Sequence, residues 1–214
     1  MAPLYEFQAA RHPRPPRAIS NVLAQHPRLR FSTAEGQFDT LAAKLRAGDI
    51  DFILGALRPP EYARDLKGEA LLTDRMSVVV REGHPLTRLP KITMDDLMSA
   101  QWILSNHGTP SRILFDLSFT AANLIPPVEA VETSDHAILR GLLLHSDLVT
   151  VISSHQLHYE IAAGVVKVLD IALPNTSRVI GIIQRMDSRP SPGALALMTA
   201  IRDIIAEIED PNST

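Results

Sequence analysis

The chain has 214 residues, a formal net charge of −3 at pH 7 and no cysteine. This length suits one large domain or two small lobes with a substantial core, and the negative charge argues against a chain-wide basic surface for nucleic acid. Without cysteine there is no disulfide framework, thiolate metal site or cysteine nucleophile, which fits a reducing compartment. The N-terminus lacks the apolar core of a signal peptide, and no run could cross a membrane. We therefore expect a cytoplasmic protein without membrane contact.

Helices and strands are predicted to alternate in the first part of the chain. Hydrophobic periodicity indicates a helix at 17–26, a strand at 28–34 and a helix at 38–48 that ends at Gly48. The strand that follows, 50–57, is apolar on both faces, as in a parallel sheet covered by helices. The segment 45–55 is therefore predicted to be the turn between the helix and the second strand of a β-α-β unit.

The same alternation continues to the C-terminus. Thr93 and Asp96 are spaced as a capping box, and Thr109 with Pro110 marks the start of a longer helix. The pattern predicts the α/β class with mostly parallel sheets, and the number of strands favours two lobes. The further strands are 76–80, 101–105, 127–132, 148–153, 165–171 and 178–185, and the further helices are 92–100, 109–124, 136–145, 154–164 and 191–209.

The order of several short motifs resembles the effector-binding domain of LysR-type transcriptional regulators. The motifs are His26-Pro27 at the end of the first helix, the Glu35-Gly36 turn, a Leu-x-x-Gly-x-x-Asp turn at 45–51 and Gly-His-Pro-Leu at 83–86. The stretch 142–171 also resembles the family. The sequence of this stretch is most similar to the subgroup named for galactose-binding-protein regulators.

Two features depart from the family pattern. The winged helix-turn-helix and linker helix that open the family's sequences have no counterpart in this chain, so we expect no operator binding by the chain alone. The apolar first strand of the family is replaced by the sequence of residues 4–14, LYEFQAARHPR. This replacement puts the strand, and the part of the effector site that it carries, in question.

The resemblance implies two Rossmann-like lobes, as in type 2 periplasmic binding proteins, joined by two crossover segments. Lobe I would hold residues 1–80 and 190–214, lobe II would hold 81–189, and a small-molecule effector would bind in the cleft between them. The resemblance also implies homodimers, with helices 38–47 and 134–145 as candidate contacts. The effector would shift lobe closure or subunit packing, and DNA would be contacted only through a helix-turn-helix domain.

Candidate effector contacts are polar side chains near helix N-termini that follow strands. There, backbone N–H groups and the helix dipole favour anions, and ligands of open α/β sheets bind at this edge. We expect hydroxyl and amide donors around a small organic acid or a sugar-like effector, with Arg112 as charge partner. Helix capping alone is the alternative for Thr109 and Ser134. The candidates are Gln37, Phe38, Thr109, Ser111, Arg112, Ser153, Ser154 and His155, with Glu35 and segment 8–11 offered by the same argument.

No metal, cofactor or enzymatic activity is predicted. His155, His158 and Glu160 are spaced one helical turn apart, but no strong third ligand and no His-Glu-x-x-His motif accompany them. A nucleophile elbow, a Walker loop and a dinucleotide fingerprint are also absent. Two alternatives stay open: a bilobal solute-binding protein not linked to transcription, and a hydrolase using Ser153, Ser154 and His155. The basic segment 11–17 favours a solvated loop over a nucleic-acid contact.

Overall fold

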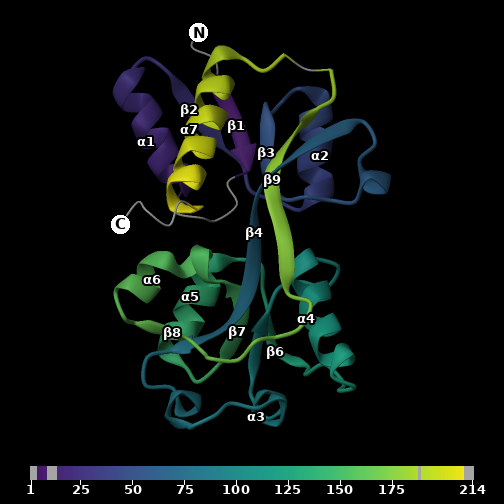
Figure 1. Ribbon diagram of the computed structural model, residues 1–214, viewed down its shortest axis with the longest axis vertical. Coiled ribbons are helices and arrows are strands. Elements are labelled where there is room, and N and C mark those ends of the chain that lie inside the picture. Colours follow the sequence, from purple (N-terminus) through teal and green to yellow (C-terminus); the bar gives the residue numbers. More distant parts are fainter. Residues whose placement is uncertain (1–3, 9–13, 188, 210–214) are drawn as a thin grey trace. The chain divides into compact units, whose positions relative to one another are not determined.

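The computed structural model describes residues 4–8, 14–187 and 189–209. It divides into two compact units, Met1–Asp74 with Arg178–Thr214 (unit 1) and Arg75–Ser177 (unit 2). The chain passes between the units twice, within β4 (Leu66–Arg81) and at the start of β9 (Ser177–Arg185) (Figure 1). The predicted boundaries at 80/81 and 189/190 lie farther along the chain, because both crossings fall inside strands and not in the loops that follow them.

The sheet of unit 1 includes the N-terminal strand. In strand order, β2 (Arg30–Thr33), β1 (Leu4–Gln8), β3 (Phe52–Ala56) and β9 lie side by side, and β9 neighbours β4. Strand β1 is parallel to both β2 and β3, whereas β3 and β9 are antiparallel. The N-terminal strand, whose formation the sequence left open, is therefore present and lies between β2 and β3.

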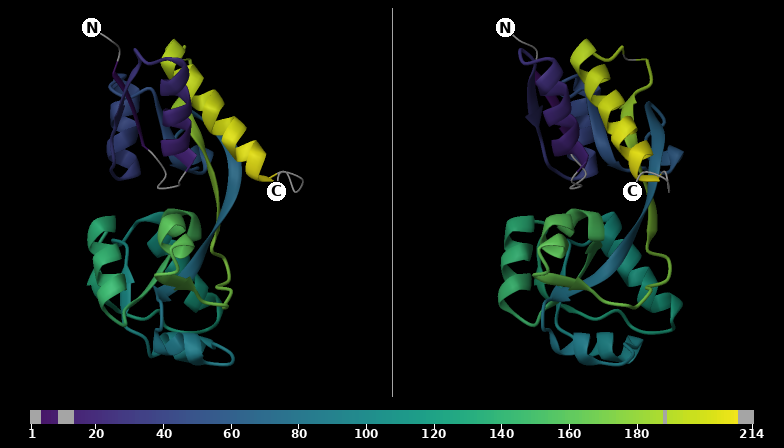
Figure 2. Two further views of the ribbon diagram at one scale, coloured as in Figure 1. Left: turned by 90° about the vertical axis from the view of Figure 1, so that its left-hand side faces the viewer. Right: turned by 60° about the vertical axis from the view of Figure 1, so that its left-hand side comes forward.

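Helices cover both faces of the unit 1 sheet, which explains why β3 is apolar on both sides. Helices α1 (Arg14–Gln25) and α7 (Pro192–Glu209) lie side by side on one face, as both views of Figure 2 show. Helix α2 (Phe38–Ala47) packs on the other face. Along β3, Phe52 and Leu54 join the cluster with α1 and α7, and Ile53 joins the cluster with α2.

Gly48 ends α2 as predicted. It adopts a left-handed conformation with φ of 85°, and its N–H donates to the carbonyl of Leu45 at 3.2 Å. A side chain is strained at this φ, so glycine suits the turn for a backbone reason. The turn leads directly into β3 and positions α2 against the sheet, a purely structural role.

The sheet of unit 2 has the order β4-β7-β5-β6, and β8 (Val166–Val168) also pairs with β4. Strands β7 (Val149–Ser153), β5 (Trp102–Leu104) and β6 (Glu129–Glu132) are parallel, and β4 is antiparallel to β7 and β8. The parallel pairs belong to the predicted β-α-β units. The antiparallel pairs involve β4 and β9, the two strands that cross between the units.

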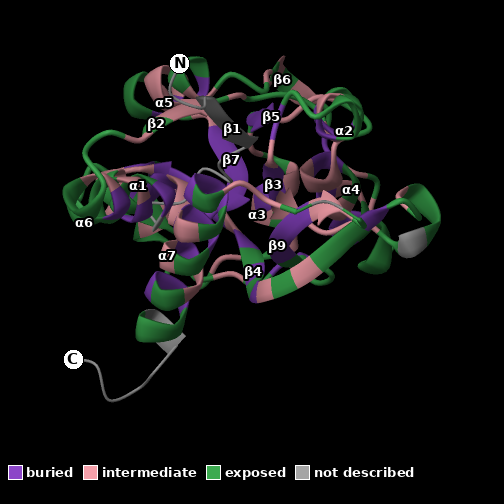
Figure 3. Cartoon of the chain, turned by 90° about the horizontal axis from the view of Figure 1, so that it is seen from above, coloured by how far each residue is buried: buried purple, intermediate pink, exposed green. Residues whose placement is uncertain are grey.

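Unit 2 is also covered on both faces. Helices α3 (Met94–Met98) and α4 (Pro110–Ala121) pack around Trp102, whose ring centroid lies 4.9 Å from that of Phe115. Helix α5 (His136–His145) packs with Ile103 on the opposite face. Strands β5 and β7 are buried along their whole length, whereas β6 alternates between intermediate and exposed residues. Figure 3 shows that the helices are exposed on their outer sides.

Two predicted elements differ from the structure. The strand predicted at 76–80 extends over Leu66–Arg81, and the helix predicted at 154–164 is split into a 3-10 turn, η3 (Ser154–Leu157), and α6 (His158–Ala162). Two further short turns, η1 (Pro60–Tyr62) and η2 (Pro85–Arg88), were not predicted. Within the described part of the chain, no helix combines the length and apolar character that a membrane span requires.

Candidate functional site

Three polar segments of unit 2 meet at one edge of its sheet. They lie at the ends of the parallel strands β5, β6 and β7 and comprise residues 105–109, 133–135 and 153–155, of which Ser153 is the last residue of β7. Because neighbouring parallel strands end at the same edge, these segments are brought together although they are far apart in sequence. We call them the edge segments.

Hydroxyl and amide groups connect the first two edge segments. The hydroxyls of Ser105 and Thr109 lie 3.0 Å apart, and Thr109 donates to the carbonyl of Asn106 at 2.7 Å. Ser134, from the segment after β6, donates to the side-chain oxygen of Asn106. Sequence reasoning missed Ser105 and Asn106, since only the pairing of β5 with β6 brings Asn106 to Ser134.

Helix caps account for part of this arrangement. The Thr109 hydroxyl accepts a hydrogen bond from the backbone N–H of Arg112 at 3.3 Å and caps α4, as predicted. Asp135 caps α5, accepting from the N–H groups of Ala137 and Ile138 at 2.7 and 3.2 Å. Ser134, for which capping was an alternative, bonds to Asn106. The edge segments thus combine two helix N-termini with side chains that join them.

Arg112 lies buried in the first turn of α4. Its side chain is 6% exposed, its Nε donates to Asp116 at 3.0 Å, and its Nη2 lies 2.8 Å from the carboxylate of Glu129. Burial lowers the pKa of Arg112, but the bonds and charges of Asp116 and Glu129 outweigh it and raise the pKa above its usual value. Its Nη1 is buried without a hydrogen-bond partner. The guanidinium charge is therefore already balanced by two carboxylates of the protein.

The remaining candidates are divided between the units. Ser153 ends β7 and is buried, and Ser154 and His155 begin η3. Gln37 and Phe38 belong to unit 1, where the exposed Gln37 precedes α2 without capping it through its side chain. The guanidinium of Arg58 lies 5.0 Å from the centre of the Phe38 ring, a cation–π contact. Ser111 lies in the first turn of α4, and residues 9–11 of segment 8–11 lie outside the described residues.

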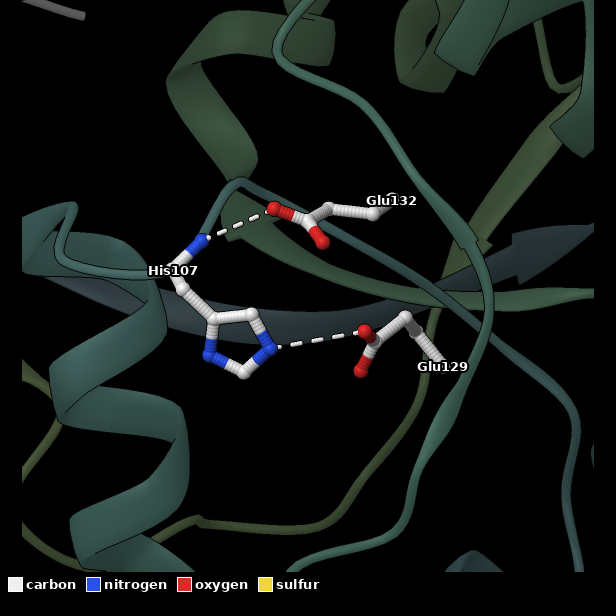
Figure 4. A group of neighbouring side chains, drawn as sticks. All are labelled: His107, Glu129 and Glu132. Atoms are coloured by element: carbon white, nitrogen blue, oxygen red, sulfur yellow. Dashed lines mark hydrogen bonds and ion pairs between the residues drawn. The ribbon is translucent and has the colours of Figure 1, made fainter.

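A cluster of side chains includes His107 of the first edge segment and two glutamates of β6. Figure 4 shows His107, which follows β5, facing Glu129 and Glu132 of β6. The His107 ring nitrogen Nε2 lies 3.5 Å from Glu129, and the His107 backbone N–H donates to Glu132 at 3.0 Å. A hydrogen bond with its own backbone N–H holds the pKa of Glu129 below its usual value, and Arg112 adds to this against the effect of burial. Sequence reasoning missed this cluster because it depends on the β5–β6 register.

Comparison with known families and curated proteins gives the following matches. The family model of the LysR substrate binding domain matches residues 10–206. The HTH-type transcriptional regulator GalR of Pseudomonas putida is 48% identical over 192 residues, covering 90% of this chain and 48% of that protein. The regulator PcaQ of Agrobacterium fabrum is 29% identical over 91% of this chain and 63% of its own length. The chain thus spans between about half and two thirds of these relatives.

Solved structures share the fold. The effector binding domain of QuiR in complex with shikimate superposes with a TM-score of 0.75 at 20% identity, covering 97% of this chain and 99% of that one. The regulatory domain of CcmR from Synechocystis, in complex with 2-PG, gives 0.78 at 16% identity, covering 94% and 96%. These similarities establish a periplasmic-binding-protein-like α/β fold.

Proposed function

Because this chain belongs to the LysR substrate-binding domain family, we propose that it senses a small metabolite and that its edge segments form part of the effector site. In the whole protein, the effector would change DNA binding through a helix-turn-helix domain. The change requires the effector to favour one arrangement of the protein over another. The proposed place of action is the cytoplasm, and no enzymatic step is proposed.

The convergence of the three edge segments carries this proposal. Residues that follow β5, β6 and β7 supply hydroxyls, an amide and two helix N-termini at one edge of a parallel sheet. Such edges bind ligands in open α/β folds, and helix N-termini favour negatively polarised groups. The resemblance also predicts that Gln37 and Phe38 contribute to the effector site from unit 1, in a cleft between the lobes. This part stays a prediction.

The chemistry of the edge segments favours an effector rich in oxygen. Ser105, Asn106, Thr109 and Ser134 offer donors and acceptors for hydroxyl or carboxylate groups. Arg112 is buried and paired with Asp116 and Glu129, so its charge is already balanced before an effector binds. We therefore propose a small organic acid or a sugar-like compound that is bound mainly through neutral donors.

Thermal unfolding against a ligand panel tests the proposal. Aromatic acids, short dicarboxylates, sugars and sugar acids are added to the chain, and one class is expected to raise the melting temperature. A ligand at a hundred times its dissociation constant adds about 2.7 kcal/mol to the free energy of unfolding. Failure of every class to shift the melting temperature would count against effector binding by this chain.

Two matched cap variants separate binding from stability. Thr109→Ala removes the cap of α4 and an edge hydroxyl, whereas Thr93→Ala removes the cap of α3, which leads into the opposite end of β5. Each substitution is expected to cost about 1 kcal/mol of stability. Only Thr109→Ala is expected to reduce the ligand-induced shift. If the ligand raises the melting temperature of both variants equally, the first edge segment does not contact the effector.

We also propose that the chain forms homodimers through α2 and α5. Helix α5 supports this, since Ile138 is 52% exposed although it is a large apolar residue. Ile138→Lys is expected to weaken self-association in sedimentation experiments. Ile113→Lys, at a residue of α4 with similar exposure, serves as the control. Sedimentation of the unaltered chain as a monomer at high concentration would contradict the proposal.

A further inference from the structure

Among the described residues, His107, Glu129 and Glu132 are the one group of three side chains whose metal-ligating atoms lie within 4.8 Å of one another. All three belong to unit 2 and come from β6 and the residues that follow β5. We propose that they form a binding site for a divalent first-row transition metal ion, such as Zn²⁺. The proposal does not depend on effector binding, because it concerns the metal ion alone.

The ligand set determines the class of metal. One imidazole and two carboxylates suit zinc and its neighbours in the first transition row, whereas magnesium prefers oxygen ligands and keeps several waters. Metal–nitrogen and metal–oxygen distances of about 2.0–2.2 Å require ligand atoms nearer to each other than 4.8 Å. His107 and Glu132 are exposed, so small side-chain rotations close this distance. Three protein ligands leave at least one coordination position open to water or another oxygen.

The surroundings of the cluster orient its carboxylates. Arg112 holds one oxygen of Glu129, while the other faces the His107 ring (Figure 4). The His107 backbone N–H holds one oxygen of Glu132. Partners of this kind fix metal ligands in productive orientations and contribute to affinity.

The charge balance also favours a cation. Arg112 pairs with the carboxylates of Asp116 and Glu129, and a third carboxylate, that of Glu132, accepts from the backbone N–H of His107. These three carboxylates outnumber the one guanidinium charge paired with them. A divalent ion neutralises the surplus negative charge beside a buried guanidinium that already has its own carboxylate, Asp116.

Calorimetric titration with Zn²⁺ tests the proposal. The chain, freed of affinity tags and treated with a chelator, is expected to bind one equivalent of Zn²⁺ more tightly than Mg²⁺. His107→Gln and Glu132→Gln are each expected to weaken Zn²⁺ binding by more than about tenfold, because even the loss of outer partners costs roughly 10–100-fold. His145→Gln, which alters an exposed histidine at the end of α5, is expected to bind as the unaltered chain does.

A second readout guards against misfolded variants and nonspecific binding. Co²⁺ is added to ¹⁵N-labelled chain, and its paramagnetism is expected to broaden the amide signals around residues 107, 129 and 132 before others. Circular dichroism checks that each variant is folded. Absence of saturable Zn²⁺ binding, or binding that persists in folded His107→Gln, would overturn the proposal. Broadening centred elsewhere, for example at His155 and His158, would also overturn it.

Discussion

Gly181 marks a place where the backbone of β9 passes too close to its neighbours for any side chain. A Cβ atom there would lie 2.0 Å from the carbonyl oxygen of Glu69 in β4 and 2.9 Å from the side chain of Leu57. The first contact is with backbone, which cannot rotate away. The close approach of β4 and β9 in unit 1 thus depends on one residue without a side chain.

Gly181→Ala is therefore expected to destabilise the chain by about 3 kcal/mol or more, because overpacking against backbone has no simple relief. Gly141→Ala is a matched control that is expected to change the free energy of unfolding in the opposite direction. Gly141 lies inside α5 with no neighbour within 4 Å of an added Cβ, so alanine should stabilise the chain by about 0.5–1 kcal/mol. Urea unfolding measures both variants. Equal effects of the two substitutions would show that the β4–β9 contact is looser than described.

Arg112 gives a second prediction at the scale of residues. Arg112→Met removes the ion partner of Glu129, whose side chain is 16% exposed, and is expected to cost about 2–4 kcal/mol. Lys167→Met, which breaks a solvent-exposed pair with Glu82 in the same unit, is expected to cost less than about 1 kcal/mol. Denaturant unfolding compares the two. A cost for Arg112→Met as small as that of Lys167→Met would mean that Glu129 finds other partners or water.

At the scale of elements, an ion pair joins α7 to β4. Nε and Nη2 of Arg202 donate to the two carboxylate oxygens of Glu69, at 2.7 and 2.8 Å. The hydrogen bond from Arg202 lowers the pKa of Glu69 below its usual value. A carboxyl group with a lowered pKa in the folded chain contributes stability above its unfolded pKa of about 4.3, and this stability is lost as pH falls through the folded pKa.

Arg202→Met is accordingly expected to reduce stability more at pH 7 than at acidic pH. The difference should be small, since both side chains are about a third exposed to solvent. Urea unfolding of both proteins at pH 7 and at pH values below 4 provides the comparison. If the substitution costs the same at each pH, the ion pair does not contribute to stability.

Elements with local signals could be predicted from the sequence. The capping box of Thr93 and Asp96, the Thr109 cap and the Gly48 stop each depend on residues a few positions apart, and all three are present. The first half of β4 was missed for two reasons. It neighbours β9, which is more than a hundred residues away in the sequence, and its buried residues are interrupted by exposed ones. The split between η3 and α6 was missed because the apolar spacing of 154–164 suits one continuous helix.

At the scale of the whole molecule, sequence order alone identified the family, and the fold follows from it. The residues that make up the edge segments could be predicted only in part, and their contact with an effector stays a proposal. Thr109, Ser153 and Ser154 were named as candidates because they lie where a strand leads into a helix or a turn. Ser105, Asn106 and the cluster of His107 with two glutamates needed the pairing of β5 with β6, which no local pattern specifies. Residues marked by a local pattern could therefore be predicted, whereas residues brought together by strand register could not.

The central claim is that the edge segments of unit 2 contact the effector. Its most direct test is a ¹⁵N-resolved NMR titration of the chain with the compound that stabilises it best in the melting panel. We expect the largest amide shifts in residues 105–112, 133–135 and 153–155, at the ends of β5, β6 and β7. Shifts concentrated instead on α3 and β8, with the edge segments unchanged, would contradict the account.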